Sequence, residues 1–420
     1  METRPLTAPA FTTYQKFLIG VLALLQFTVV LDFMVLSPLG DLLMKTLDMG
    51  PTGFGLVVSA YAFSAGGGGI LAAGFADRYD RKKLLLFFYA GFIVGTLFCG
   101  LADSFWMLLS ARIVTGLFGG VIGSVSMAII TDLFALNQRG RVMGAVQMGF
   151  AASSVLGIPI SLYLATLWGW HAAFLMIVLL ASVIFVAVLV KMAPVTAHLE
   201  LQSDNNAFRH LWHTLTVKSY QTGYLAIAFL SIGGFMLMPF TSAFLINNVG
   251  LKQEELPLVY MFTGISSILV MPLIGRLSDR YSKFLIFTVG SVLAILSSLV
   301  YTNIPPVPLW IVVAVNIVML TGVTSRMIPA ATLNTSVPDL RDRGAYMSIT
   351  SSLQQMAGGV AAIAGGLIVT QPDRNRPIEH FDTLGYVVSL VFVLCIFFVY
   401  RVDKLVVQKN AVNQPAEPIH

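Results

Sequence analysis

Long apolar runs alternate with short polar segments along almost the whole chain. A helix needs about 20 predominantly apolar residues to cross the hydrocarbon core of a bilayer. The pattern therefore predicts an all-α polytopic membrane protein. Its twelve membrane-spanning helices are expected at approximately residues 17–43, 54–75, 84–102, 105–130, 142–166, 171–190, 221–246, 256–275, 284–302, 308–331, 344–369 and 383–400.

The amino-acid composition agrees with this pattern and argues against a soluble or nucleic-acid-binding protein. Of 420 residues, 57% are hydrophobic and only 11% are charged, against about 25% charged in soluble domains. The net charge of +5 does not indicate nucleic-acid binding, because the basic residues lie in short loops between apolar runs. Cys99 and Cys395 both lie within apolar runs, which favours buried thiols over a disulfide or a metal pair.

The distribution of basic residues predicts an orientation. An even number of spans places both ends of the chain on the same side of the membrane. If that side is the cytoplasm, its segments hold nineteen Lys and Arg residues and the opposite loops hold four. This bias follows the positive-inside rule. We therefore expect a protein of the cytoplasmic (inner) membrane with both termini in the cytoplasm.

Two motifs occur twice and divide the chain into halves. The Asp-Arg-Tyr triplets of DRYDRKK (77–83) and SDRYSK (278–283) align at an offset of 202. QRGRVMG (138–144) and DRGAYMS (342–348) align at an offset of 204. Two six-helix halves in parallel repeat place a substrate site at their interface, near mid-membrane. The expected units are an N-terminal bundle (1–190), a linker (191–220), a C-terminal bundle (221–402) and a cytoplasmic tail (403–420).

The linker carries an amphipathic pattern. Phe208, Leu211, Trp212 and Leu215 follow the spacing i, i+3, i+4, i+7. This spacing predicts a short helix lying on the cytoplasmic surface of the membrane. A flexible tether is the alternative interpretation.

The loop at residues 73–82 resembles the signature G-x-L-a-D-R-x-G-R-K of the major facilitator superfamily. It reads AGFADRYDRK, in which the Asp, both Arg and the Lys match, whereas Ala73 and Asp80 replace the two Gly. The second copy keeps Gly275 but has Ser282 at the later Gly position. The resemblance covers essentially the whole chain. It implies the major facilitator fold and secondary transport by alternating access.

Two further motifs indicate which branch of the superfamily the chain resembles. Arg112 and Gly116 resemble the R-x-x-x-G motif of proton-coupled members. Span 5 has Gly157-Ile158-Pro159 without the following Gly pair of drug/proton antiporters, and is similar to the arabinose-efflux-like branch. His171 stands where that branch has an Arg. The resemblance implies export of a drug, sugar or metabolite by proton antiport.

Charged residues within spans are the candidates for proton coupling. Asp32 is the only carboxylate well inside a predicted span, sixteen residues beyond Lys16, or about 24 Å along a helix. Intramembrane ionisable residues are functional candidates by default, so we assign Asp32 and Arg112 to proton coupling. A structural ion pair is the alternative for both. Asp41 is expected to be a solvated acid at the outer rim.

Uncharged polar residues within spans are candidates for lining the cavity. The resemblance implies that spans 1, 4, 7 and 10, with parts of 2, 5, 8 and 11, surround the substrate. Interhelical hydrogen bonds are the alternative role for the amides, and snorkelling to the cytoplasmic surface is the alternative for the arginine. The candidates are Gln26, Gln147, Asn316, Gln354 and Arg326.

The charged loops are candidates for gating. The resemblance implies that the loop after span 2 holds the cytoplasmic face closed when the cavity opens outward. A plain positive-inside anchor is the alternative. The candidates are Asp77, Arg78, Arg81, Asp132, Asp279 and Arg280.

No enzyme motif, nucleotide loop or metal-ligand spacing occurs in the loops, so we expect no catalytic residue, cofactor or metal. The expected partners are a small-molecule substrate, protons and membrane lipid, without nucleic acid, and the expected state is a monomer. A proton symporter or uniporter that imports a metabolite is the alternative function. A non-transporting membrane sensor is the more distant one.

Overall fold

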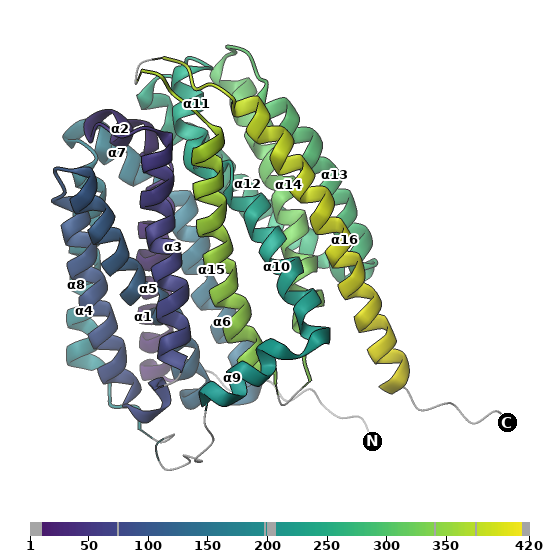
Figure 1. Ribbon diagram of the computed structural model, residues 1–420. Helices are drawn as coiled ribbons and strands as arrows, with labels where there is room; N and C mark the ends of the chain where they lie inside the picture. Colours follow the sequence, from purple (N-terminus) through teal and green to yellow (C-terminus); the bar gives the residue numbers. More distant parts are fainter. Residues whose placement is uncertain are drawn as a thin grey trace.

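The computed structural model describes residues 11–73, 75–196, 199, 207–339, 342–373 and 376–413. Figure 1 shows helices that run roughly along one direction, with α2 and α11 at one end and α9 at the other. The first half contains α1 (Thr13–Val35), α2 (Gly40–Thr46), α3 (Pro51–Ala73), α4 (Arg81–Gly100), α5 (Phe105–Leu133), α6 (Leu136–Ala152), α7 (Ile158–Trp168) and α8 (His171–Lys191). We call the α2/α11 end the outer end and the α9 end the inner end, after the orientation expected from the sequence.

The second half repeats this plan after the short helix α9 (Ala207–Thr216). Its helices are α10 (Lys218–Phe235), α11 (Thr241–Asn247), α12 (Leu256–Arg280), α13 (Lys283–Thr302), α14 (Leu309–Thr335), α15 (Arg343–Ile368) and α16 (Phe381–Asn413). The last helix continues to Asn413, so part of the segment expected as a tail (403–420) is helical. α9 confirms a helix in the linker, and its Trp212 and Leu215 are exposed.

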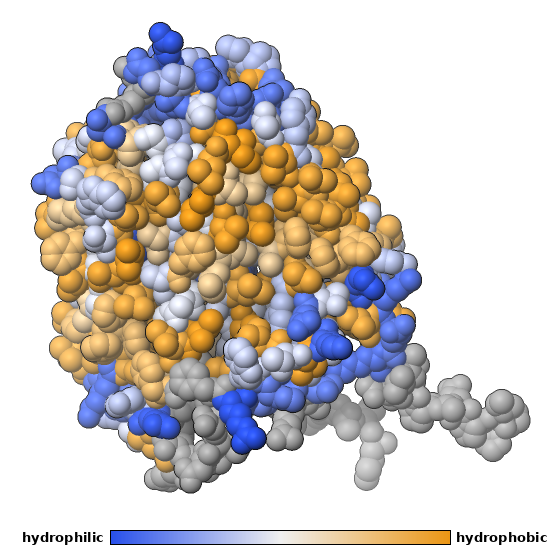
Figure 2. All heavy atoms as spheres, in the orientation of Figure 1, coloured by the Kyte–Doolittle hydropathy of each residue, from blue (hydrophilic) through white to orange (hydrophobic). Residues whose placement is uncertain are grey.

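Within the described part of the chain, eleven helical segments are long and apolar enough to cross a membrane. Figure 2 shows the corresponding hydrophobic belt between two hydrophilic ends. The remaining expected span is α15, a helix of 26 residues. At 1.5 Å per residue it is about 39 Å long, which is enough to cross the hydrocarbon core of about 30 Å. The all-helical membrane fold is therefore confirmed.

Proline interrupts the first span of each half at the same place. α1 ends before Pro38 and α2 follows it, whereas Pro239 lies in a short 3₁₀ turn between α10 and α11. The two prolines are 201 positions apart, close to the offset of the repeated motifs. Proline has no backbone N–H and clashes with the preceding turn, which breaks both helices. The fifth span contains a π-helical turn at Ser153–Gly157, just before Pro159.

The halves meet along two pairs of helices, α3 against α15 and α12 against the fifth span. Small residues allow the backbones to approach closely. A Cβ at Gly55 of α3 would lie 2.6 Å from the carbonyl oxygen of Ala362 in α15. Inside the first half, a Cβ at Gly120 would lie 2.4 Å from the carbonyl oxygen of Ala65. At these contacts the absence of a side chain is what lets the helices pack closely.

Hydrogen bonds between the halves gather at the outer end. Asn247 Nδ2 donates to Asp41 Oδ1 over 2.6 Å, and Lys45 Nζ contacts both Asp41 Oδ2 (2.8 Å) and Asn247 Oδ1 (3.1 Å). Asp41 is 4% exposed, so the expectation of a solvated rim acid is wrong. An amide and an ammonium group replace its water. We call Asp41, Lys45 and Asn247 the outer cluster.

Three more bonds lie near the outer cluster. Ser37 Oγ donates to the carbonyl oxygen of Met238, and Ser242 Oγ donates to the carbonyl oxygen of Ser37 over 2.9 Å. Thr52 Oγ1 donates to the carbonyl oxygen of Gly366 over 2.7 Å. Each of these three bonds joins the first half to the second. The structure is therefore closed at its outer end.

Candidate functional site

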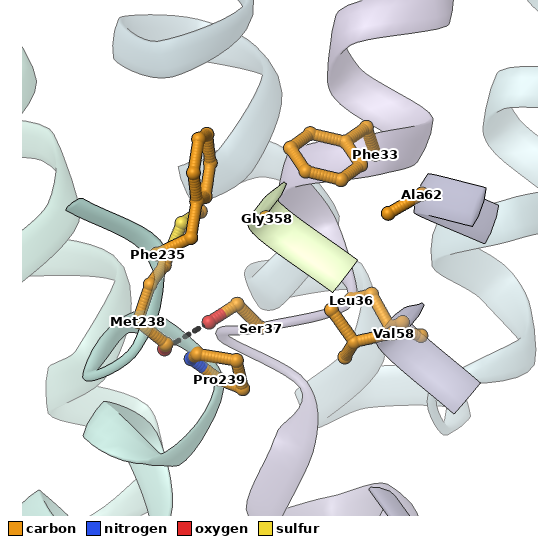
Figure 3. Close-up of a pocket in the computed structure, with 9 residues that line it drawn as sticks. All are labelled: Phe33, Leu36, Ser37, Val58, Ala62, Phe235, Met238, Pro239 and Gly358. Atoms are coloured by element: carbon orange, nitrogen blue, oxygen red, sulfur yellow. Dashed lines mark hydrogen bonds between the residues drawn. The ribbon is translucent and has the colours of Figure 1, made fainter. Parts of the chain in front are cut away.

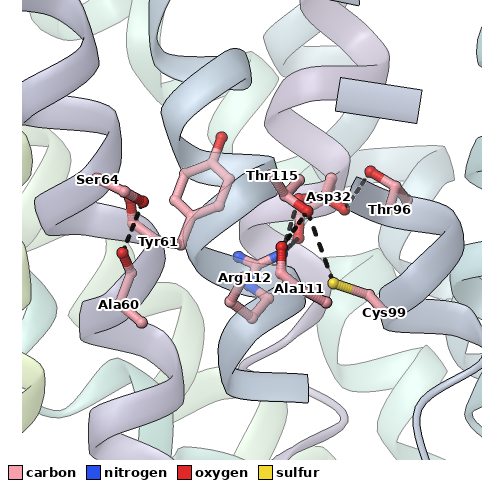
Figure 4. A network of polar contacts seen from close by, with 9 residues as sticks. All are labelled: Asp32, Ala60, Tyr61, Ser64, Thr96, Cys99, Ala111, Arg112 and Thr115. Atoms are coloured by element: carbon pink, nitrogen blue, oxygen red, sulfur yellow. Dashed lines mark hydrogen bonds and ion pairs between the residues drawn. The ribbon is translucent and has the colours of Figure 1, made fainter. Parts of the chain in front are cut away.

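An ion pair lies inside the first half. α1 carries Asp32 and α5 carries Arg112, and Arg112 Nη1 donates to Asp32 Oδ2 over 2.7 Å. Thr96 Oγ1 of α4 donates to the other carboxylate oxygen, Asp32 Oδ1, over 3.1 Å. Both charged residues are 0% exposed. Figure 4 shows that the pair lies between α1, α4 and α5.

A second layer of side chains surrounds this pair. The ring of Tyr61 in α3 lies 4.4 Å from Arg112 Cζ, a cation–π distance. Thr115 Oγ1 donates to the carbonyl oxygen of Ala111 over 2.8 Å and lies 3.7 Å from Cys99 Sγ. Arg112 Nε has no hydrogen-bond partner in the described structure. The guanidinium is held by the carboxylate of Asp32, by the Asp32 carbonyl oxygen, to which Arg112 Nη1 donates over 3.4 Å, and by one ring, which leaves it fewer contacts than it can make.

The ion pair has a simple electrostatic consequence. Its two charges cancel, so the intact pair adds no net charge to the membrane interior. Breaking a buried pair leaves an uncompensated charge, which typically costs 3–5 kcal/mol. A proton arriving on Asp32 would remove the negative charge and weaken the contact with Arg112. The arrangement can therefore translate protonation into a change of helix packing.

The three candidate glutamines of the cavity are accessible to different degrees. Gln26 and Gln354 are half-buried and Gln147 is exposed. In the described structure none of their amides has a hydrogen-bond partner. They therefore remain available to a ligand.

Asn316 lies differently from the glutamines. It is buried in α14, and its Nδ2 donates to the carbonyl oxygen of Val312 in the same helix over 2.9 Å. This bond occupies one of the two donors of the amide. The structure does not bring Asn316 together with the three glutamines through any hydrogen bond.

Arg326 lies in the interior of the second half, 1% exposed, so the snorkelling interpretation is wrong. Its Cζ lies 3.8 Å from the ring centre of Phe392 in α16, and its Nε donates to Ser291 Oγ of α13 over 3.1 Å. No Asp or Glu pairs with it among the described residues. Arg326 packs against α13 and α16, inside the second half. It does not line the pocket between the halves.

The first charged loop is built around Arg81 and Asp80. Arg81 Nε donates to Asp132 Oδ2 over 3.1 Å, and its Nη1 donates to the carbonyl oxygen of Ala76 over 3.0 Å. Asp80 Oδ1 accepts hydrogen bonds from the backbone N–H groups of Lys82 and Val195, each over 2.9 Å. Asp80 thus caps α4 and fixes the chain that follows α8. This contact explains why an Asp is useful at the signature's Gly position.

The two copies of the charged motif are not equivalent. Asp279 and Arg280 are exposed at the end of α12, and Ser282 Oγ caps α13 over 3.4 Å. In the first copy Arg78 is exposed. The side chains of Ala73 and Asp77 lie outside the described structure.

A small pocket lies between the halves, just inside the closed outer end. Figure 3 shows that side chains from both halves face it, with the Ser37–Met238 bond beside it. None of its lining residues is charged. They are Phe33, Leu36, Ser37, Val58, Ala62, Phe235, Met238, Pro239 and Gly358.

Several residues of these sites were not anticipated from the sequence. The i, i+4 spacing of Asp41 and Lys45 is a signal that indicates an intrahelical pair. No sequence signal indicates their contact with Asn247, because it depends on how the halves dock. Phe33 and Phe235 are 202 positions apart, the offset of the charged motif, and this correspondence could have identified them.

A family model described as Major Facilitator Superfamily matches residues 22–362. The chain belongs to this family. Among the described residues, no group of His, Cys, Asp or Glu is arranged to hold a metal ion.

Curated relatives match the chain over different lengths. The chain is 23% identical to a "Probable sugar efflux transporter" of Helicobacter pylori (strain P12) over 88% of this chain and 91% of that protein. It is 25% identical to "Putative transporter AraJ" of Escherichia coli over 58% of this chain and 61% of AraJ. It is 38% identical to "Vacuolar membrane amino acid uptake transporter fnx2" of Schizosaccharomyces pombe over 27% of this chain and 20% of fnx2. The chain thus aligns with less than two thirds of AraJ and of fnx2.

Solved structures share the fold. A bacterial homologue of the human lysosomal transporter Spinster, in an inward-facing and unoccupied conformation, has a TM-score of 0.77 at 15% identity, over 98% of this chain and 100% of that chain. A D-xylose–proton symporter has a TM-score of 0.75 at 14% identity, over 92% and 98% respectively. These similarities show the major facilitator fold.

Proposed function

We propose that this protein is a secondary active transporter that exports a small organic molecule in exchange for protons. Its place is the cytoplasmic membrane, with both termini in the cytoplasm. The observation that carries the proposal is the Asp32–Arg112 ion pair, 2.7 Å long and 0% exposed, inside the first half. The similarity to a protein named a probable sugar efflux transporter supports export.

The proposed mechanism follows from the closed outer end and the buried ion pair. The outer end is closed by the outer cluster and its neighbouring bonds, so cargo enters from the inner end in this conformation. When the halves rock open at the outer end, water reaches Asp32 and delivers a proton. Protonation weakens the contact with Arg112, and after the halves return the proton leaves at the inner end, which re-forms the ion pair of the conformation described here. Each half moves as one packed body.

The inner loops supply the opposite closure in this proposal. Arg81 and Asp132 hold the ends of α4 and α5 together, while Asp77, Arg78, Asp279 and Arg280 lie in the two repeated loops. Neutralising Arg81 is expected to slow the cycle while cargo affinity stays within about twofold. A selective loss of affinity would contradict this role.

Import by a proton symporter is the second candidate. The Asp32–Arg112 pair serves this candidate equally well, because such a pair can couple a proton to cargo that moves in either direction. The two candidates differ in the direction of proton movement that accompanies cargo. The same vesicle experiment therefore separates them.

The test uses purified protein in liposomes that contain a pH-sensitive dye. Sugars, antibiotics and metabolites are added one at a time to vesicles with an imposed pH gradient. Antiport moves cargo and protons in opposite directions. Asp32→Asn should abolish cargo-dependent proton flux, and Asp103→Asn, a change at an exposed loop acid, should not alter it. Unchanged coupled flux in Asp32→Asn would exclude the role proposed for Asp32, and parallel movement would establish the symporter.

A further inference from the structure

A groove lies at the inner end of the first half, where a 3₁₀ turn (Ala76–Arg78) connects α3 to α4. Figure 1 shows α4 at the periphery of the first half, away from the second half. The groove has a volume of about 510 Å³, within the range of roughly 300–1,000 Å³ that is common for ligand sites. It therefore has room for part of a ligand. Its lining residues are Phe75, Tyr79, Lys83, Leu84 and Phe87.

The walls of the groove are aromatic and held in place by packing. Phe75 meets Tyr79 edge to face, with ring centres 6.2 Å apart. Phe75 and Phe87 both pack on the buried ring of Phe88, with ring centres 6.4 Å and 5.3 Å from it. The other faces of the walls stay accessible, since Tyr79 is 56% exposed and Phe87 is 63% exposed. Exposed aromatic rings at the end of a membrane span are typical of the lipid–water interface.

Lys83 supplies the charge of the groove. Its side chain is exposed and has no hydrogen bond or ion pair within the described part of the chain. Neighbouring charges are already engaged, because Lys82 Nζ donates to the carbonyl oxygen of Leu189 over 3.0 Å and Asp80 Oδ1 accepts from two backbone N–H groups. No acidic residue is among the described residues that line the groove. An anion can therefore approach Lys83 without displacing an existing partner.

The groove continues into an apolar stripe along α4. Phe87, Val94, Phe98 and Leu101 recur at helical spacing, and all four side chains are exposed. The stripe covers fourteen positions, or about 21 Å along a helix. One leaflet contributes about 15 Å, half of the hydrocarbon core of a bilayer. An acyl chain can therefore follow the stripe from the groove to the middle of the membrane.

We propose that this groove binds an anionic phospholipid of the leaflet at the inner end. Its phosphate group lies at Lys83, its glycerol region lies between the aromatic walls, and an acyl chain follows the stripe of α4. A lipid is favoured over a soluble anion because Lys83 stands one helical turn from the exposed ring of Phe87, at the edge of a membrane span. A soluble anion would use the charge and leave the apolar surface uncovered.

The second half lacks the charge at the corresponding position. At the offset of 202 found for the repeated motif, Leu285 stands at the position of Lys83. Leu285 is exposed, as are Tyr281 and Val289 on either side of it. The repeat therefore keeps an exposed apolar surface without the charge. We expect no preference for an anionic lipid in the second half.

The experiment counts the lipids that stay bound to the full-length protein in detergent, by native mass spectrometry. The probes are dioleoyl-phosphatidylglycerol (anionic) and dioleoyl-phosphatidylcholine (zwitterionic), which share their acyl chains, with inorganic phosphate as a soluble competitor. One basic residue at a membrane surface is worth about fivefold in the binding of an anionic lipid. We expect one site that prefers phosphatidylglycerol about fivefold and that millimolar phosphate does not displace.

Variants locate the site. Lys83→Gln should lower the affinity for phosphatidylglycerol about fivefold, to that for phosphatidylcholine. Lys16→Gln is the matched control and should bind like the wild type, because Lys16 is also exposed near the inner end of a span but does not line the groove. Phe87→Ala should weaken both lipids alike, because it removes an apolar wall and no charge. The unfolding temperature of each variant without added lipid confirms that it is folded.

The outcomes separate a built site from general surface charge. Unchanged preference in Lys83→Gln, or an equal loss in Lys83→Gln and Lys16→Gln, would overturn the site. Displacement by phosphate would show a soluble anion in place of the lipid and would also overturn it. These measurements involve no cargo and no proton movement, so their failure would leave the proposed transport function standing. Conversely, unchanged coupled flux in Asp32→Asn would leave the lipid site standing.

Discussion

Asn247 of the second half donates a 2.6 Å hydrogen bond to Asp41 of the first half. Lys45 bridges the two residues, and all three lie at the outer end. Hydrogen bonds to charged groups typically contribute 1.5–3 kcal/mol. Because this bond must break before the outer end can open, its strength sets part of the balance between the two conformations.

Replacing Asn247 by Ala should therefore favour the outward-open conformation. The reporter is Met238→Cys, which places a thiol behind the closure, in a chain whose native cysteines are both buried. A membrane-impermeant maleimide should label this thiol about ten times faster in the Asn247→Ala variant, since about 1.4 kcal/mol is a tenfold change in an equilibrium.

Asn248→Ala provides the control for that measurement. Asn248 exchanges two 2.8 Å hydrogen bonds with Ile378, and both residues belong to the second half. Its loss should not change the labelling rate. Equal acceleration by both variants would mean that local loosening, and not opening between the halves, exposes the thiol.

The Asp32–Arg112 pair should show strong non-additivity. Arg112→Gln alone leaves a buried carboxylate unpaired and should lower the unfolding free energy by roughly 3–5 kcal/mol. The double variant Asp32→Asn, Arg112→Gln removes both charges and should recover most of the unfolding temperature in detergent. Cargo-dependent proton flux should remain absent in both. Full additivity of the two changes would show that the pair does not act as a unit.

Tyr61 is expected to connect the interface between the halves with the ion pair. Its ring lies 5.4 Å from that of Phe33 and 4.4 Å from Arg112 Cζ. Tyr61→Leu removes this ring and the cation–π contact, so we expect severalfold faster proton leakage in vesicles without cargo. Tyr61→Phe keeps the ring and should leak like the wild type. Leakage in Tyr61→Phe equal to that of Tyr61→Leu would assign the effect to the hydroxyl group.

Asp80 should contribute more to the folding stability than a Gly at this position of the signature would. Asp80→Gly removes the helix cap, worth a few tenths of a kcal/mol against Gly, and the carboxylate's hydrogen bond with Val195, so it should cost roughly 2 kcal/mol of stability. Ser282→Gly removes only a 3.4 Å cap in the second copy and should cost a few tenths of a kcal/mol. Unfolding temperatures in detergent, measured side by side, check this order. A larger shift for Ser282→Gly would contradict it.

The sequence predicted the fold well because its strongest signals are local. Apolar runs long enough for a bilayer act within one helix. The partnership of Asp32 with Arg112 was foreseen as a possibility because very few charges lie inside the spans. Asp41 was misjudged because its partner Asn247 lies 206 positions away and meets it only after the halves dock. The snorkelling alternative for Arg326 was wrong because the side chain's contacts, with Phe392 and Ser291, come from other helices of the same half.

The contacts of Asp80 also shorten the connection between the halves. Val195 is fixed by Asp80 and by the backbone N–H of Arg81, and Ala193 donates to the Tyr14 hydroxyl group, so the chain stays with the first half up to this point. α9 begins at Ala207 and packs on α10 and α15. Only residues 196–206 remain to join the two bodies, and eleven residues reach at most about 40 Å. The linker is therefore a short tether, and its length limits how far the inner ends of the two halves can separate as cargo enters.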